Sequence, residues 1–335
     1  MSADRPEPGR SDPRAPYPDL RGALMLTLLA TLSAALIGVL LMDLGTLAAV
    51  GVGQALGMGA IATMAARRVP EPQAERLGLQ GFYPRAILAV LCLAPALLLA
   101  SELDNVAASW IGASESQSER GSESGFESQG ENGIETQSET QSESPGESAG
   151  ADEDEPEAVV LAPLIDPEDP WSLLQAIVVL AGISPVVEEF LFRGVIQQGL
   201  AARLGLLRGV AFTALLWTLL RPAPVDHWLR FLAAAIASLG LGCALGIVRV
   251  ATGSILASIL LSSLWSAIGL TSLALEGSVD LPGLNVEHSH LPWPVLLASA
   301  GLVFWAGRRL HRRAEDRFRV ERAAFGLEGP GIGSP

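Results

Sequence analysis

The segment Ser184–Leu200, SPVVEEFLFRGVIQQGL, places two adjacent glutamates and an arginine at the end of an apolar run. Residues 171–187, which lead into the pair, carry no charged side chain. Carboxylates against such a run are costly unless they are paired. Glu189 and Arg193 are four residues apart, so on a helix they share a face and can form an ion pair. Glu188 is rotated by roughly 100° from Glu189, which leaves its carboxylate free for other work.

Two interpretations of these three side chains stay open on spacing alone. A desolvated carboxylate can take a proton from water near neutral pH, which would make Glu188 a general base. The alternative is a charged helix end at the membrane interface, with Arg193 extending its guanidinium toward the headgroups. The elements around the motif are needed to choose between them.

The composition separates an acidic segment from an apolar remainder. Of the 335 residues 49% are hydrophobic, yet the formal net charge is -14. Residues 115–150 form nine tetrapeptides that each begin with Glu, and DEDEPE follows at 152–157. With 14 acids and one arginine, residues 115–157 carry a net charge of -13. The like charges of this segment repel one another, and few of its side chains are apolar. We therefore expect a disordered acidic loop at 113–158, with a specific acidic binding segment as the alternative.

The rest of the chain is predicted to be an all-α, polytopic integral membrane helix bundle of about eight transmembrane helices. A spanning helix needs about 20 mainly apolar residues. The candidate stretches, of which the fifth is the shortest, are 23–42, 44–66, 86–101, 171–187, 209–220, 231–248, 254–275 and 293–307.

Arginine predicts the orientation in the membrane, because cytoplasmic loops carry an excess of positive charge and the chain has no lysine. In an eight-span arrangement most arginines fall on one side, opposite the acidic loop and the loop at 276–292. We therefore expect a multi-pass protein of the cell (plasma) membrane with both termini cytoplasmic and the acidic loop extracytoplasmic. Arg221 and Arg230 depart from this pattern.

These features divide the chain into six segments along its length. They are a polar tail at 1–22, N-terminal transmembrane helices at 23–112, the acidic loop at 113–158, a membrane core at 165–275, an outer loop with the last transmembrane helix at 276–307, and a basic cytoplasmic tail at 308–335.

The membrane core resembles the CPBP (Abi) family, which comprises CAAX prenyl proteases and bacteriocin-processing or immunity proteins. EEFLFRG followed by VIQQGL (188–200) resembles the family's first motif, EExxxR. LLRGVAFTALLWTLL (206–220) resembles the second conserved helix, and LGLGCALGIVRVATGSILASILLSSLWSAIGL (239–270) resembles the TGS-containing end. The resemblance covers roughly residues 165–275 and implies an intramembrane endopeptidase.

The resemblance also implies roles for individual residues. Glu188 would activate water, while Glu189 and Arg193 would hold the geometry. In the family, two histidines and an Asn or Asp from later helices polarise the scissile carbonyl, stabilise the oxyanion or hold a divalent metal. In this chain Arg221, Ser262 and Ser266 stand at the positions of the two histidines and the Asn.

These departures predict a weak or inactive endopeptidase, a pseudoprotease, that needs no cofactor. Ser262 cannot ligate a divalent ion as imidazole does, and Arg221 cannot act as a base because it keeps its proton. Arg221 could instead neutralise Glu188 and close the polar cluster. The histidines all lie outside the expected spans, at His227, His288, His290 and His311. We expect a protein of the lipid bilayer that binds a membrane-embedded or prenylated-type peptide or a partner protein.

Two further function classes stay open. The first is an active CAAX-type intramembrane endopeptidase, and the second is an unrelated transporter or channel with a Glu–Arg polar site. EHSH at 287–290 could take part in a metal site, although no further ligand accompanies it. Nucleic-acid binding is not expected, because the chain is acidic and has no lysine.

Overall fold

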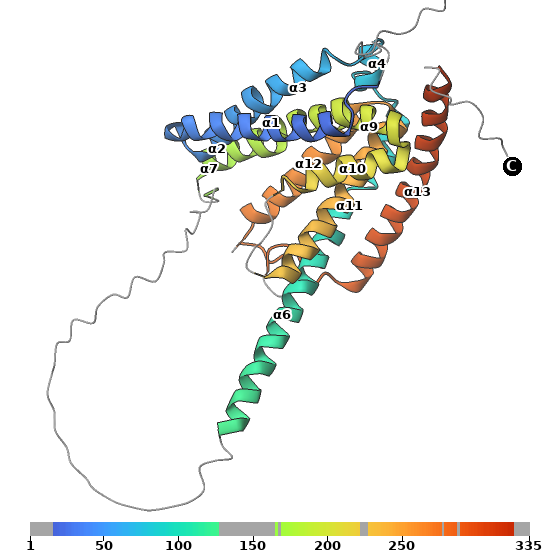
Figure 1. Cartoon of the computed structure of the whole chain (residues 1–335). Coiled ribbons are helices and arrows are strands. Elements are labelled where there is room, and N and C mark those ends of the chain that lie inside the picture. The colour runs from blue at the N-terminus through green and yellow to red at the C-terminus, as the bar shows by residue number, and fades with distance from the viewer. Residues whose placement is uncertain are drawn as a thin grey trace, which may run out of the picture. The chain divides into compact units, whose positions relative to one another are not determined.

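The computed structural model describes residues 16–126, 165–166, 169–221, 227–276, 278–286 and 289–324. These residues form helices and connecting turns, and no β-strand occurs among them (Figure 1). The predicted all-α membrane class is thereby confirmed. The chain divides into a main unit, Met1–Ala108 with Ile165–Pro335, and a second unit, Ser109–Leu164. Everything below concerns the main unit unless stated.

The N-terminal part supplies three apolar helical runs, with a polar connection between the second and the third. Helix α1 begins after Asp19, whose side chain accepts a hydrogen bond from the Gly22 amide, as N-cap residues do. The elements of this part are α1 (Leu20–Leu40), η1 (Met42–Leu44), α2 (Thr46–Val52), η2 (Gly53–Met58), α3 (Gly59–Ala66), α4 (Gln73–Leu77), α5 (Pro84–Leu91) and α6 (Ala96–Phe126).

The membrane core begins with one long helix that contains two π-helical turns. Its elements are α7 (Pro170–Ala176), η4 (Ile177–Ile183), α8 (Ser184–Glu189), η5 (Phe190–Ile196) and α9 (Gln197–Leu204). The helices α10 (Leu206–Thr218), α11 (Trp228–Thr252), α12 (Ile255–Ala274) and α13 (Trp293–Ala324) follow. Helix α10 packs between α9 and α11, α11 also contacts α13, and α12 contacts η4 and α8 (Figure 1).

Six helical runs among the described residues are long and apolar enough to cross a membrane. They are Leu20–Leu40, Thr46–Ala66, Ala86–Ile111, Pro170–Leu204, Trp228–Thr252 and Ile255–Ala274, with Leu206–Thr218 as a shorter apolar helix. These seven correspond to seven of the eight predicted spans. The eighth, 293–307, lies in α13, where Arg308 and Arg309 interrupt the apolar stretch before it reaches the length of a span.

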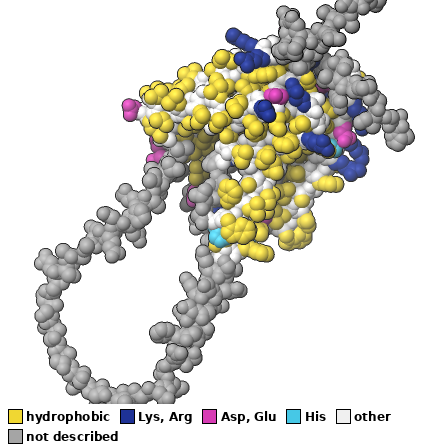
Figure 2. Space-filling model, viewed as in Figure 1, with side chains coloured by type: hydrophobic (Ala, Val, Ile, Leu, Met, Phe, Trp, Pro, Cys, Tyr) yellow, Lys and Arg dark blue, Asp and Glu magenta, His cyan; other side chains and the backbone are white. Residues whose placement is uncertain are grey.

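The surface of the bundle is apolar, as a surface in contact with lipid would be. Figure 2 shows hydrophobic side chains over most of the visible face, with arginines gathered toward one end. On α1 alone Leu28, Leu32 and Leu36 are each more than half exposed. An apolar exposed surface of this extent is unusual for a protein in water, and it agrees with the predicted membrane location.

Polar contacts mark the two ends of α11. At its start, Arg230 pairs with Asp104 of α6 at 3.3 Å. Near its end, Arg249 donates to the main-chain carbonyl of Arg76, and Arg317 of α13 donates to that of Thr252. Arg230 and Arg249 are separated by about 28 Å of helix, close to the thickness of a bilayer's hydrocarbon core. The apolar middle of α11 therefore lies between the polar contacts at its start and those near its end.

Helix α6 extends into the segment for which a disordered loop was expected. It continues to Phe126, so the expectation of irregular structure from residue 113 is wrong for residues 113–126. Extending a helix that has already formed is far easier than starting one, and the apolar stretch of α6 provides that start. Residues 127–158 of the expected loop lie outside the described residues.

Helix α1 and the run from α2 to α3 approach closely at two buried glycines. A Cβ atom on Gly53 would lie 2.5 Å from the Ala34 carbonyl oxygen, and one on Gly57 would lie 2.5 Å from the Ala34 nitrogen. Both glycines are buried. Small residues at such positions let membrane helices touch backbone to backbone.

We predict that Gly57→Ala lowers the stability of the bundle, because the new methyl group would press on backbone that cannot move aside. Overpacking of this kind costs about 1–3 kcal/mol. The matched control is Gly59→Ala, whose Cβ would come no closer than 3.7 Å to its surroundings. Thermal unfolding in detergent should show a lower midpoint for Gly57→Ala alone, and equal midpoints for the two variants would contradict this packing.

Candidate functional site

The motif glutamates lie where the long core helix changes its winding. Pro185 has no amide hydrogen, so the carbonyl four residues before it loses its usual helical partner. The π-helical turn η4, Ile177–Ile183, lies directly before Ser184 and Pro185, and such local adjustments accommodate proline in membrane helices. The second π-helical turn, η5, begins directly after Glu189 and contains Arg193. Turns of this kind occur frequently at functional sites.

Glu189 and Arg193 form the predicted ion pair inside the bundle. Arg193 Nη1 lies 3.0 Å from Glu189 Oε1, and both side chains are completely buried. Arg193 Nη2 donates to the Gly242 carbonyl on α11 at 3.2 Å, and the guanidinium lies 4.9 Å from the centre of the Trp217 ring. The interpretation of Arg193 as a residue that extends toward the headgroups is therefore wrong, because its charge is held by partners on three helices.

Gly242 makes room for this arrangement. A Cβ atom at residue 242 would lie 3.0 Å from Ala214 Cβ and 3.1 Å from Trp217 Cε3. Helices α10 and α11 can therefore approach closely at the level of Arg193, which brings the Trp217 ring and the Gly242 carbonyl to the same guanidinium.

Glu188 points away from Glu189, as helical spacing predicts, and meets two donors from α10 and the turn after it. Trp217 Nε1 and Arg221 Nη2 each lie 2.8 Å from Glu188 Oε2. The Glu188 side chain is 14% exposed and that of Arg221 is 37% exposed. The Arg221 guanidinium also lies 4.1 Å from the centre of the Trp217 ring. Glu188, Trp217 and Arg221 thus form one closed cluster, which we call the Glu188 cluster.

The Glu188 cluster forms part of the wall of a cavity of about 730 Å³. The wall combines apolar residues of α1, α2, α8 and α12 with a few polar groups. Among these, the Ser184 hydroxyl donates to Gln54 Oε1, and Ser266 comes from α12. A mainly apolar cavity with a few polar groups is typical of a site for a small or extended apolar ligand.

The structure brings only some of the predicted site residues together. Glu188, Arg221 and Ser266 share the cavity wall, whereas Glu189 and Arg193 are enclosed behind it. Ser262 is buried in α12 and is not part of that wall. Ser258, one turn earlier on α12, is also buried, and its hydroxyl donates to the Ile255 carbonyl at 2.9 Å.

Sequence reasoning missed Trp217, Gln54 and Ser184 as parts of the site. Trp217 lies in the segment 206–220 that resembles the second conserved helix, yet it was given no role, and its indole N–H donates directly to Glu188. Gln54 had a detectable signal, because an amide in an apolar membrane helix needs a partner. Ser184 had no such signal, because a serine hydroxyl in a helix commonly donates to a main-chain carbonyl of the same helix.

No histidine of the described residues hydrogen-bonds to Glu188. His227 Nδ1 accepts from the Leu229 amide at the start of α11, His290 pairs with Glu102, and His311 pairs with Glu315. Glu287 and His288 of the EHSH segment lie outside the described residues. Within the described part of the chain, no three His, Cys, Asp or Glu side chains come together. With guanidinium groups beside both motif glutamates, the site does not fit a divalent metal.

Comparison with known proteins identifies the class of this chain. Residues 170–268 match the family model described as type II CAAX prenyl endopeptidase Rce1-like. No match was found among curated proteins or among solved structures. Together with the six spanning helices, the match makes this a CAAX-protease-like multi-pass membrane protein. Its membrane core is therefore similar to this family, which favours a CAAX-protease-like protein over an unrelated transporter or channel.

We predict that the buried ion pair stabilises the bundle as a unit. Either Glu189→Ala or Arg193→Ala leaves an uncompensated charge in an apolar interior, which typically costs about 3–5 kcal/mol. The double substitution removes both charges and should cost less than the sum of the two single ones. Thermal unfolding in detergent for the four proteins of this cycle measures the coupling. Simple additivity would show that the two side chains do not act as a pair.

Proposed function

We propose that this CAAX-protease-like protein is a weak or inactive intramembrane endopeptidase that binds a membrane-embedded peptide or a partner protein. The observation that carries the proposal is the 2.8 Å bond between Arg221 Nη2 and Glu188 Oε2. It places a permanent cation on the carboxylate that the family motif implies as the water-activating group. The alternative, an active CAAX-type endopeptidase, needs that carboxylate free.

The chemistry of the Glu188 cluster supports low activity. If Glu188 took a proton from water, its carboxyl group would become neutral and its ion pair with Arg221 would be lost. Arg221 itself cannot accept a proton. Peptide hydrolysis also needs donors preorganised on the developing oxyanion. The family supplies imidazoles for this purpose, whereas here one position holds Arg221 and the other a serine, Ser262, that does not line the cavity.

The cavity beside the cluster supports a binding role. It is lined mainly by apolar side chains and has a volume of about 730 Å³, which suits an apolar side chain, a prenyl-type chain or a segment of a membrane peptide. Gln54, Ser184 and Ser266 add groups that can orient such a ligand. The same fold would then hold a ligand without cleaving it.

We predict that purified protein in detergent cleaves neither prenylated nor unprenylated peptides above the rate of a protein-free control. Loss of one oxyanion donor typically lowers the rate about a hundred- to a thousandfold, and loss of groups that act together leaves very little activity. An active CAAX-type endopeptidase in the same assay serves as the positive control. Cleavage that disappears in Glu188→Ala would overturn the proposal and favour the active alternative.

The binding role predicts that a prenylated peptide binds to the unmodified protein and that filling the cavity weakens this binding about tenfold or more. Gly269 lines the cavity and has open space around a new side chain, so Gly269→Trp should block it. Gly301 on α13 also has open space but lies outside the cavity, which makes Gly301→Trp the matched control. Equal affinities for the two variants, measured by fluorescence anisotropy, would contradict ligand binding in this cavity.

We also propose that both termini face the cytoplasm and the acidic loop faces outward, on the basis of the arginine distribution. This orientation requires α13 to cross the membrane as the eighth helix. A single cysteine introduced as Gly130→Cys, with Cys92 and Cys243 replaced by Ser, should react with an impermeant maleimide added to intact cells. Labelling of Gly130→Cys only after the membrane is permeabilised would reverse the orientation.

A further inference from the structure

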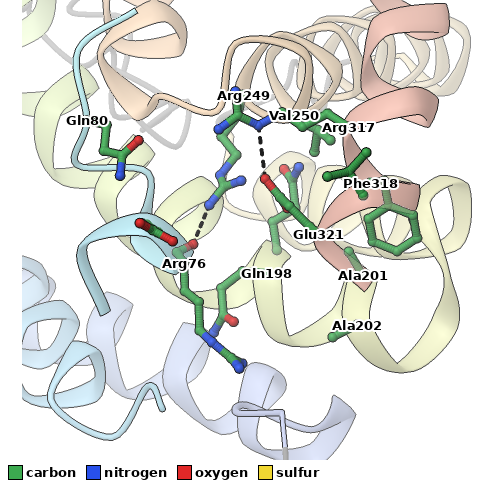
Figure 3. A pocket seen from close by; sticks show the side chains of 13 residues that line it. Arg76, Gln80, Gln198, Ala201, Ala202, Arg249, Val250, Arg317, Phe318 and Glu321 are labelled. Atoms are coloured by element: carbon green, nitrogen blue, oxygen red, sulfur yellow. Dashed lines mark hydrogen bonds and ion pairs between the residues drawn. The ribbon is translucent and has the colours of Figure 1, made fainter. Parts of the chain in front are cut away.

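A second cavity, of about 350 Å³, lies at the arginine-rich end of the bundle. Its wall is formed by α4, α9, the end of α11 and the last turns of α13, and it shares no residue with the cavity beside Glu188. Figure 3 shows the side chains of Arg76, Arg249, Arg317 and Glu321 gathered around it. From these side chains we infer that the cavity binds a phosphate group.

Arg249 is a buried cation that forms no direct ion pair with a described residue. Its side chain is only 4% exposed, and its Nη2 donates to a main-chain carbonyl, that of Arg76. Its Nε has no hydrogen-bond acceptor. No carboxylate of the described residues lies within ion-pair distance of it. Glu321 interacts with the Arg249 charge only from beyond ion-pair distance. Because a buried charge is stable only when it is compensated, this position favours an additional anion in direct contact with the guanidinium.

The other charged groups of the wall leave an excess of positive charge. Arg76, Arg249 and Arg317 face Glu75 and Glu321, so the wall carries three positive and two negative groups. Glu321 is engaged by Arg317, whose Nε lies 2.9 Å from Glu321 Oε1. Arg317 Nη1 is engaged by the Thr252 carbonyl at 3.1 Å. The Glu321 carboxylate is therefore already paired with Arg317, and Arg249 keeps its positive charge without a direct ion pair.

Phosphate is the anion that fits this position best. The planar guanidinium group matches the oxygen geometry of phosphate and forms strong charge-assisted hydrogen bonds with it. Arg249 lies within one turn of the end of the span Trp228–Thr252, which places the cavity at the level of lipid headgroups. Basic pockets between membrane helices bind such headgroups. The ligand is then the phosphate of an anionic lipid, or inorganic phosphate through the same contacts.

The test uses full-length protein in nanodiscs that contain phosphatidylcholine alone or with increasing phosphatidic acid, and it measures the midpoint of thermal unfolding. Phosphatidic acid should raise the midpoint of the unmodified protein. The half-saturating lipid fraction should rise about tenfold in Arg249→Gln, because a charge-assisted hydrogen bond is lost. Arg312→Gln is the control, since Arg312 is an exposed arginine of α13, the helix that carries Arg317, and lies outside the cavity. It should behave as the unmodified protein does.

A second variant keeps the test decisive if Arg249→Gln does not fold. Ala202→Trp fills the cavity from α9 and leaves every arginine in place, so it should also abolish the stabilisation by phosphatidic acid. In a parallel arm, inorganic phosphate is compared with chloride at equal ionic strength in detergent. Stabilisation by inorganic phosphate identifies the free anion as sufficient, and stabilisation by phosphatidic acid alone identifies the headgroup. No stabilisation in either arm, or equal losses in Arg249→Gln and Arg312→Gln, would overturn the inference.

Discussion

The structure depends on the constraint that a charge enclosed in a membrane bundle must be paired, because no water is present to stabilise it. Glu189 and Arg193 meet this constraint on one helix face, with both side chains fully buried. Their position fixes which face of the core helix points inward. It also explains why Gly242 on α11 offers its carbonyl and why the Trp217 ring lies against the guanidinium. Three helices are thus held in register around one ion pair.

The same constraint acts on Glu188, with a different outcome for chemistry. Its carboxylate faces a cavity rather than the interior, so it could have stayed available to water. Instead Trp217 and Arg221 both bind one of its oxygens. The arginine stands where the CPBP motif has an imidazole, and it compensates the carboxylate's charge without offering a group that can transfer protons. We propose that this one replacement makes the scaffold better suited to ligand binding than to hydrolysis.

Several features of the site could not be predicted from the sequence. The π-helical turns η4 and η5 have no periodic signature in residues 171–200, because an extra residue in a turn is set by how neighbouring helices pack. The resemblance placed both Ser262 and Ser266 in the site, yet of these two only Ser266 lines the cavity. A motif aligned by sequence does not say which face of α12 is turned inward. The helical extension to Phe126 was missed because composition alone suggested irregular structure.

The sequence by itself determined the all-α membrane class, the places of seven spanning or apolar helices, and the pairing of Glu189 with Arg193. All of these follow from local properties, namely the length of apolar stretches and the four-residue spacing of a helix face. Only the tertiary structure decided that Arg221 reaches Glu188, and that Arg76, Arg249 and Arg317 meet around a second cavity. These contacts join segments far apart in the chain, and their formation depends on helix crossings at small residues such as Gly242 and Gly57. Where such crossings fall is set by the packing of the whole bundle rather than by any single stretch.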